Sequence, residues 1–599
     1  MSNALVHRGP DSSGYFEDQN VGLGFRRLSI MDLQGGDQPI YNEDRSLVLL
    51  CNGEIYNYCE LAHELRQKGH AFRTKSDVEV LVHLYEEHGE GMLGRLNGQF
   101  AFVIYDRREK TLLLARDHFG INPLHYAIVD GLLVFASEIK AILEHPMIGR
   151  EVDLTGLDQL LSFPGLVSPR TMFKGVRSLK SGHFLKLKNS LISLTQYWDL
   201  DYPDRDEVSY DKPEQYYVEG LSDLFTRSVK YRLQSDVPVG FYLSGGLDSS
   251  MVAAAMRHVS PETKRHSFSI EFADKEICES KYQRMVAEHV QSMHHQMRFD
   301  WSEISDRLPK MIYHCESPVK ETFNTCSLAL SEAAKESGIK VILAGEGADE
   351  LFAGYIGYRF DRLGLRQAKQ YDLETILEDE IREKLWGDRD LFYEVDQHGF
   401  REIKTTLYSN QVNNMFDEFD CLNHELVCKE RLKNRDYLHQ RSYLDFKLRL
   451  SDHLLSEHGD RMILANSVEG RYPFLDINLV EFARAIPPSL KLNQFTEKYI
   501  LKRIAEDWVP PEIINREKFG FRAPGSPYLL RQNIEWINDL LSYDRIRRQG
   551  YFNADVVERL KQTYSRPGFN LHPHHEADLL MVVLSFGLFL DLFRLPSLN

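Results

Sequence analysis

Short apolar runs separated by turn-forming residues fill roughly the first third of the chain. They predict strands at Val21–Phe25, Leu47–Cys51, Phe100–Tyr105, Thr111–Ala115 and Leu132–Ala136. Helical periodicity is confined to a few stretches, such as Glu60–Lys68 and Asp77–His88. Strands that greatly outnumber helices, with short connections, predict an α+β layered domain with a mostly antiparallel sheet.

The pattern then changes to strand, loop and helix in repetition. Buried strands are predicted at Val239–Leu243, His266–Ile270 and Lys340–Ala344, and a helix at Ser250–His258. This alternation predicts an α/β doubly wound parallel sheet that binds ligands at the carboxyl ends of its strands. From about Tyr355 onward the chain is predicted to be mainly helical.

A polar, acidic and proline-punctuated stretch, Asp199–Glu214, separates the two patterns. We therefore predict a first domain at 1–200, a linker at 201–215 and a second domain at 216–599. The chain has 599 residues, and at about 150 residues per domain this length allows two to four domains.

Composition excludes several classes of protein. Hydrophobic residues make up 43% and charged residues 27% of the chain, which is typical of a globular protein and excludes disordered and fibrous classes. The net charge of −17 argues against nucleic-acid and membrane-surface partners. Seven scattered cysteines and no secretory signal favour a reducing, cytoplasmic location. The longest apolar run, Leu579–Leu590, is too short for a membrane span and predicts a buried helix.

The strongest chemical motif is VGFYLSGGLDSS, Val239–Ser250. A buried strand leads into a loop where Gly245 and Gly246 let backbone amides approach an anion, and a helix N-terminus follows. Serine hydroxyls beside the glycines can donate to phosphate oxygens. Asp248 suits a phosphate site only if a cation such as Mg²⁺ lies between. The alternative is an ordinary glycine turn between a strand and a helix.

A second motif, VILAGEGADELFAGY, follows another predicted strand at Val341–Tyr355. Acidic side chains at the end of a parallel strand face the ligand crevice. Asp349 is therefore predicted to hold a second side of the metal, and Glu346 to act as a base or to position an attacking amine. Read alone, the motif also fits a surface acidic turn.

Nearly all of the chain resembles the glutamine-dependent asparagine synthetase family. The resemblance rests on both loops and on motifs that occur in the family's order: HRGPDSSG (7–14), RLSIMD (27–32), CNGEIYN (51–57), SDVEV (76–80), NGQFAFVIYD through ARDHFGINPLHY (97–126), GRYPFLD (470–476) and TEKYILKR (496–503). It implies an N-terminal-nucleophile glutaminase domain with αββα layers, followed by an ATP-pyrophosphatase synthetase domain. The implied activity is conversion of aspartate to asparagine through a β-aspartyl-AMP intermediate, with ammonia from glutamine.

The resemblance also implies residue roles. In the first half, Arg27 would hold the glutamine α-carboxylate, Glu54 and Asp77 the α-ammonium, and Asn52 with Gly53 the oxyanion. In the second half, the ATP and pyrophosphate residues would be Leu243, Ser244, Gly245, Gly246, Asp248, Ser249, Ile270, Gly345 and Glu346, with Mg²⁺ on Asp248 and Asp349. Glu346 would be the acid/base residue and Lys498 the cation that stabilises adenylate formation. The implied partners are small-molecule substrates, and the family leaves room for a homodimer.

The sequence departs from the family at its start. The family's nucleophile is a cysteine directly after the initiator methionine, whereas here Ser2 follows Met1 and the HRGP motif begins at His7. Two interpretations are open: an internal methionine has been taken as the start, or the glutaminase is inactive and the synthetase uses free ammonia. Cys51 is expected to be a buried structural thiol and not a replacement. This 599-residue chain is therefore predicted not to hydrolyse glutamine.

A second departure concerns pyrophosphate and the acceptor acid. Some family members carry an arginine in the stretch that here reads VKETFNTCS, where Asn324 takes its place and Lys320 offers partial compensation. No role is predicted for residues 361–443. Two further functions stay open: an amidotransferase or cyclase acting on a larger acid, and a non-catalytic homologue. The cluster HPHHE, 572–576, matches no zinc spacing and predicts a polar loop.

Overall fold

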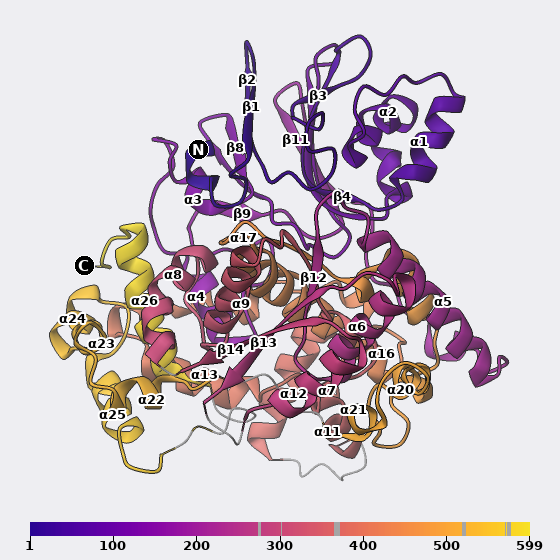
Figure 1. Cartoon of the computed structure of the whole chain (residues 1–599). Coiled ribbons are helices and arrows are strands. Elements are labelled where there is room, and N and C mark those ends of the chain that lie inside the picture. Colours follow the sequence, from indigo (N-terminus) through magenta and orange to yellow (C-terminus); the bar gives the residue numbers. More distant parts are fainter. Residues whose placement is uncertain are drawn as a thin grey trace.

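The computed structural model describes residues 1–273, 277–300, 302–364, 372–517, 523–569, 571 and 577–598, without the side chains of residues 362–364. The indigo N-terminal part stands above a larger magenta-to-yellow part (Figure 1). All the strands and helices predicted in the first half are present, with ends shifted by a few residues.

The first half is built on a six-stranded antiparallel sheet of order β11-β10-β6-β5-β4-β3. Its strands are β3 (Ile40–Tyr41), β4 (Leu47–Ile55), β5 (Gly98–Asp106), β6 (Thr111–Arg116), β10 (His183–Lys188) and β11 (Leu191–Gln196). Successive β4 side chains alternate between two cores: Leu49 and Cys51 face one, and Val48 and Leu50 face the other. This period of two is what a sheet buried on both faces requires.

The two faces of that sheet are covered differently. Helices α1 (Tyr58–Gln67) and α2 (Val80–His88) supply the apolar residues on one face. The other face packs against smaller antiparallel sheets, which consist of β1 (Ser12–Asp18), β2 (Val21–Arg27), β7 (His125–Val129), β8 (Leu132–Ala136) and β9 (Val176–Ser178). Behind β7, β8 and β9, helices α3 (Ile139–Ile142) and α4 (Leu154–Ser162) share one apolar core with residues of these strands.

The second half contains the predicted parallel sheet, with order β14-β13-β12-β15-β16. Its strands are β12 (Val239–Tyr242), β13 (His266–Phe272), β14 (Met293–Phe299), β15 (Val341–Leu343) and β16 (Glu469–Arg471). From β12 the chain moves outward through β13 to β14, then returns to the other side of β12 for β15. The order therefore reverses between β12 and β15, and a crevice at such a switch point is where doubly wound sheets bind ligands.

Helices surround this sheet. They include α6 (Leu247–Val259), α7 (Ser280–His289), α8 (Ser302–Cys315), α9 (Asn324–Glu336) and α16 (Tyr437–Asp445). Helix α16 runs directly into a π-helical segment, η7 (Phe446–Asp460). The apolar run near the end forms α26 (Leu579–Phe593), which is buried over most of its length, as predicted. Within the described ranges, no helix has both the length and the apolar content to cross a membrane.

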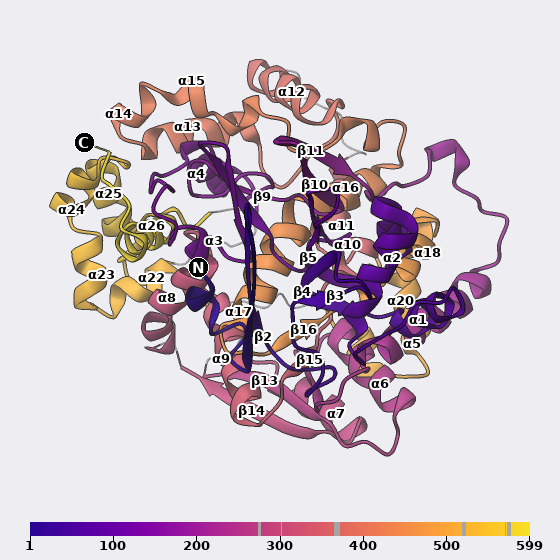
Figure 2. The same ribbon diagram turned by 90° about the horizontal axis from the view of Figure 1, so that it is seen from above.

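Polar contacts join the two halves. Seen from above, β4 and β5 overlie β15 and β16 (Figure 2). Gln99 Nε2 donates to the Gly470 carbonyl at 2.9 Å, and Asn97 Nδ2 donates to Asp476 Oδ2 at 2.8 Å. Arg8 Nη2 lies 2.9 Å from Asp460 Oδ2 at the end of η7. These buried contacts hold the carboxyl end of β4 over the parallel sheet.

Candidate active sites

A cavity of about 1360 Å³ opens beside β2 and the carboxyl end of β4. All the predicted glutamine-binding residues line it: Arg27, Asn52, Gly53, Glu54 and Asp77. Three separate chain segments supply these residues, and the fold brings all five together in one cavity.

Arg27 ends β2 and is fixed by its own surroundings. Its Nη2 donates to the carbonyls of Met31 and Asp32, both at 2.8 Å, and its Nη1 donates to Asp37 Oδ1 at 3.0 Å. A Cβ on Gly36 would lie 2.4 Å from Nη2, so the glycine leaves room for the guanidinium. A planar fork fixed in this way is suited to a carboxylate ligand.

Asn52 and Gly53 lie in the last part of β4. The Asn52 carbonyl accepts a hydrogen bond from Asn122 Nδ2 at 2.9 Å. Its own buried Nδ2 has no hydrogen-bond partner among the described residues. A buried amide without a partner is costly unless a ligand satisfies it, so Asn52 can donate to a developing oxyanion.

Gly53 adopts φ +140°, where a Cβ would lie 2.1 Å from the Gln99 carbonyl oxygen. We expect Gly53→Ala to destabilise the first half by about 2 kcal/mol or more, since the clash adds to the strain of the dihedral. Gly69→Ala is the matched control, because Gly69 also has a positive φ of +103° but nothing within 4 Å of its Cβ position. Urea unfolding should separate the variants, and equal midpoints would contradict the close approach.

Glu54 and Asp77 form a buried acidic pair. Burial and the neighbouring Asp77 raise the pKa of Glu54 well above its usual value. Burial raises the pKa of Asp77 to about 6, although its Oδ2 accepts a hydrogen bond from the Ile55 amide at 2.6 Å. One cation from the second half partly compensates the pair, since Arg471 Nη2 lies 3.1 Å from Glu54 Oε1. The remaining negative charge can be balanced by a ligand ammonium.

This pair predicts that glutamine binding depends on pH. An α-ammonium favours the ionised carboxyls, so binding at neutral pH should release protons, and affinity should fall as pH drops through about 6, the pKa of Asp77. Calorimetry in buffers of different ionisation enthalpy measures both effects. Asp77→Asn should weaken binding and reduce the proton release. Affinity independent of pH would contradict this role for the pair.

Cys51 lies in the cavity wall but is buried in the α1–α2 core. Burial, together with Asp77 and Glu54, raises the pKa of its thiol well above the usual value. A thiol that stays protonated is a poor nucleophile. As expected from the sequence, Cys51 is a structural thiol.

The Ser-Gly-Gly loop connects β12 to α6 as predicted. Gly245 has φ +78°, and a Cβ there would lie 2.9 Å from the Gln283 amide nitrogen. Ser244 Oγ and Ser249 Oγ are 3.0 Å apart, and the Gly246 amide donates to Ser244 Oγ at 3.2 Å. Hydroxyl contacts within the loop therefore hold its conformation at the helix N-terminus. A phosphate oxygen bound there can replace these weak contacts.

The acidic loop after β15 lies directly against the Ser-Gly-Gly loop. A Cβ on Gly345 would lie 3.0 Å from Asp248 Cβ. Burial, aided by the charges of Asp248 and Asp349, raises the pKa of Glu346 to about 7, and its Oε2 has no hydrogen-bond partner in the described part of the chain. A carboxyl that titrates near neutral pH is suited to accept or donate a proton.

Lys498 joins the two loops. It precedes helix α20 (Tyr499–Ala505) with φ +53°. Its Nζ lies 2.7 Å from Asp349 Oδ1 and is hydrogen-bonded to Asp248 Oδ2. Burial opposes the charge, but both carboxylates outweigh it and raise the pKa of Lys498 above its usual value. The three residues thus meet at the switch point of the sheet.

The remaining predicted residues of the second half are placed less directly. Leu243 and Ile270 are buried at the carboxyl ends of β12 and β13. Asn324 is buried, with its Nδ2 3.5 Å from Cys315 Sγ. Burial lowers the pKa of Lys320 to about 8, and its Nζ donates to the Phe163 carbonyl. The 572–576 cluster lies outside the described residues.

Comparisons with known proteins decide the family. A family model described as asparagine synthase matches residues 220–591, and one described as glutamine amidotransferase domain matches residues 1–198. The asparagine synthetase [glutamine-hydrolyzing] 1 of Bacillus subtilis is 32% identical, over 94% of this chain and 89% of that protein. The chain belongs to the asparagine synthase family.

Two fungal proteins in the comparison carry other names. Amidase chyE of Penicillium rubens is 32% identical, over 86% of this chain and 83% of its own length. Amidase chry2 of Gibberella zeae is 30% identical, over 87% and 84%. The relatives of this chain therefore include proteins named for a different activity.

Three arginines of this chain have contacts that sequence reasoning missed. Arg471 lies in the quoted GRYPFLD motif, which carried no assigned role, and joins Glu54 to the parallel sheet. Arg516 Nη1 donates to the Gly245 carbonyl at 2.8 Å, far away in sequence. Arg441 pairs with Asp361 at 3.2 Å, 80 residues away in sequence. No spacing rule finds such contacts, because each joins segments that meet only in the fold.

Proposed function

We propose that this protein is an ATP-dependent amide-forming ligase that converts aspartate to asparagine. A carboxylate oxygen of aspartate attacks the α-phosphorus of ATP, and the bond to the pyrophosphate breaks. Ammonia nitrogen then attacks the activated carbonyl carbon, and AMP leaves. The activation is needed because a free carboxylate is a poor electrophile.

The observation that carries this proposal is the Lys498 ammonium between Asp248 and Asp349, beside two glycine loops at the switch point. The Ser-Gly-Gly loop supplies amides and hydroxyls for the pyrophosphate of ATP. Lys498 supplies a positive charge next to that loop, where negative charge builds up on the α-phosphate. An ordinary glycine turn between a strand and a helix would not need a lysine held in this position.

Asp248 and Asp349 fit a magnesium ion. They come from neighbouring strand ends, are close enough for one ammonium to contact both, and offer the carboxylate oxygens that Mg²⁺ prefers. Bound there, Mg²⁺ would neutralise phosphate charge. Lys498 Nζ would then be free to turn from the carboxylates toward the nucleotide.

Glu346 is proposed to take up the proton that the attacking ammonia nitrogen loses. Its pKa of about 7 leaves a substantial ionised fraction at neutral pH, and its free Oε2 is available as the acceptor. The neighbouring carboxylates raise the pKa further by disfavouring a second nearby charge. Cations bound in the site would lower the pKa of Glu346.

Glutamine is the proposed ligand of the 1360 Å³ cavity, held there by Arg27, Glu54 and Asp77. The cysteine in that cavity wall, Cys51, is buried and protonated. We therefore expect the 599-residue chain to use ammonium and to release no glutamate from glutamine. Glutamate release above background would contradict this part of the proposal.

A second candidate is an amidotransferase that acts on a larger carboxylic acid. The similarity to the two fungal proteins named amidases supports it. The same adenylating loops would serve, and the difference would lie in the acceptor pocket. Both candidates require AMP formation.

Parallel assays with Mg·ATP, ¹⁵N-ammonium and a panel of carboxylic acids distinguish the candidates. The leading proposal predicts AMP and ¹⁵N-asparagine with aspartate. AMP formed only with a larger acid would favour the second candidate. No AMP with any acid would contradict both and favour a non-catalytic role.

A further inference from the structure

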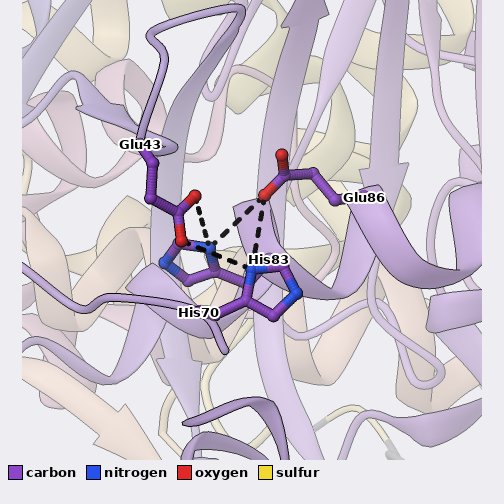
Figure 3. A group of neighbouring side chains, drawn as sticks. All are labelled: Glu43, His70, His83 and Glu86. Atoms are coloured by element: carbon purple, nitrogen blue, oxygen red, sulfur yellow. Dashed lines mark ion pairs between the residues drawn. The ribbon is translucent and has the colours of Figure 1, made fainter. Parts of the chain in front are cut away.

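Four side chains with metal-binding atoms meet in the first half, on the helical side of the six-stranded sheet (Figure 3). Glu43 follows β3, His70 follows α1, and His83 and Glu86 lie three residues apart on α2. One ligand atom from each residue lies within 4.8 Å of all the others. Three chain segments thus converge on one point.

The distances between these atoms have the size of a metal coordination shell. His70 Nδ1 lies 3.4 Å from Glu43 Oε1 and 3.6 Å from Glu86 Oε2. His83 Nδ1 lies 3.5 Å from Glu43 Oε2 and 3.5 Å from Glu86 Oε2. Zinc bonds of about 2.0–2.2 Å in a tetrahedron separate the ligands by about 3.3–3.6 Å. The four contacts, which involve both carboxylate oxygens of Glu43 and one of Glu86, are long for hydrogen bonds but match that separation.

His83 independently points to a missing ligand. Its side chain is only 1% exposed, and neither ring nitrogen has a hydrogen-bond partner among the described residues. Leaving a buried polar side chain without hydrogen bonds costs about 1–3 kcal/mol for each group. Because Nδ1 faces the two glutamates (Figure 3), a cation at the centre of the cluster would satisfy it.

A further carboxylate lies beside the second nitrogen of each imidazole, and the one beside His70 is within hydrogen-bond distance. Glu87 Oε1 lies 3.2 Å from His70 Nε2, and Glu79 Oε1 lies 3.9 Å from His83 Nε2. Glu79 is itself held by the amides of Arg73 and Thr74, both at 2.7 Å. Metal-binding histidines commonly present their second nitrogen to a carboxylate in this way.

We propose that this cluster binds one divalent transition-metal ion and that this ion is Zn²⁺. The ligands are His70 Nδ1, His83 Nδ1 and one carboxylate oxygen each from Glu43 and Glu86. Two imidazoles favour zinc over magnesium or calcium. Four protein ligands leave no open position, so the ion is structural. His83 faces Glu79, which ends the short turn η2 (Asp77–Glu79). The bound ion would therefore also stabilise the segment that carries Asp77.

Other clusters of metal-binding side chains among the described residues have less support. Glu138, beside His7 and His314, is already paired with Lys140 and Arg8. Asp158, beside Asp420 and Cys421, is paired with the buried Lys404. A cluster of Glu321, His453 and His458 offers three ligands, one fewer than a closed site needs. The His70–His83 cluster has four ligands and no lysine or arginine paired with them in the described structure.

Metal content tests the proposal. The whole chain would be dialysed against Zn²⁺ with excess Mg²⁺, and its zinc measured by mass spectrometry. We expect one zinc per chain in the wild type and in His63→Gln, a control at an exposed histidine of α1. His70→Gln and Glu86→Gln should lose this zinc. Glu87→Gln, which removes an orienting carboxylate, should weaken zinc binding about 10- to 100-fold.

Two further readouts separate loss of the site from loss of the fold. Zinc should raise the melting temperature of the wild type and of His63→Gln, but not of His70→Gln. Co²⁺ should give the intense visible bands of tetrahedral coordination in the wild type and in His63→Gln, but not in His70→Gln. Zinc retained in both ligand variants, no zinc in the folded wild type, or an octahedral Co²⁺ spectrum would each overturn the proposal.

Discussion

Lys498→Met should reduce ammonium-dependent AMP formation about 10²- to 10³-fold, which is typical when one charge directed at a transition state is removed. The ammonium contacts both Asp248 and Asp349 and lies next to the phosphate loop. Methionine keeps much of the length of the side chain and loses the charge. The loss should appear mainly in kcat, because the charge matters most where phosphate charge develops.

Lys502→Met is the matched control for that experiment. Lys502 lies one helical turn further along α20 and is not among the residues of the proposed site. We expect its activity to stay within about two-fold of the wild type, because Lys502 is a half-buried lysine outside the proposed site. If Lys498→Met and Lys502→Met behave alike, Lys498 has no role in the chemistry.

Arg471→Met should destabilise the protein by about 3–5 kcal/mol, the usual cost of leaving a buried charge without its partner. Arg471 is fully buried, lies 3.1 Å from Glu54 Oε1 and donates to the carbonyl oxygens of Arg232 and Gln234. Arg471 Nε also donates to Glu469 Oε1 at 2.8 Å, so its removal leaves Glu54 and Glu469 uncompensated at the junction of the two halves. The midpoint of urea unfolding measures the effect.

Two further variants test the cause of that loss. Arg484→Met removes an exposed ion pair with Glu481 and should cost less than about 1 kcal/mol. Glu54→Gln combined with Arg471→Met removes both partners of the buried pair and should recover part of the stability. No recovery in the double variant would show that packing, and not the pair, explains the loss.

The sequence was informative wherever a single segment determines its own structure. The apolar runs before both glycine loops predicted β12 and β15, because a central parallel strand is buried on both faces. Short continuous apolar runs predicted β4 and β5 in the same way, since both strands are buried over most of their length. β14, with the sequence MHHQMRF, was missed because it is a half-exposed edge strand. β16 has only three residues and no pattern of its own.

The candidate sites were predictable only in part, for a similar reason. Each loop could be recognised locally, but the contact of Lys498 with both aspartates depends on a helix about 150 residues beyond Asp349. The zinc cluster draws on three segments between residues 43 and 86, with no recognised motif spacing. Arg471 was visible as part of a motif, yet its partner Glu54 lies in the other half of the chain.

Isotope transfer tests the central claim most directly. Aspartate labelled with ¹⁸O in its side-chain carboxylate would be incubated with Mg·ATP, ammonium and the purified chain. The account predicts asparagine and AMP, with one labelled oxygen in the phosphate of AMP, because the carboxylate oxygen stays on the α-phosphorus when the C–O bond breaks. Label in inorganic phosphate with ADP as the product, or no label in AMP, would contradict it.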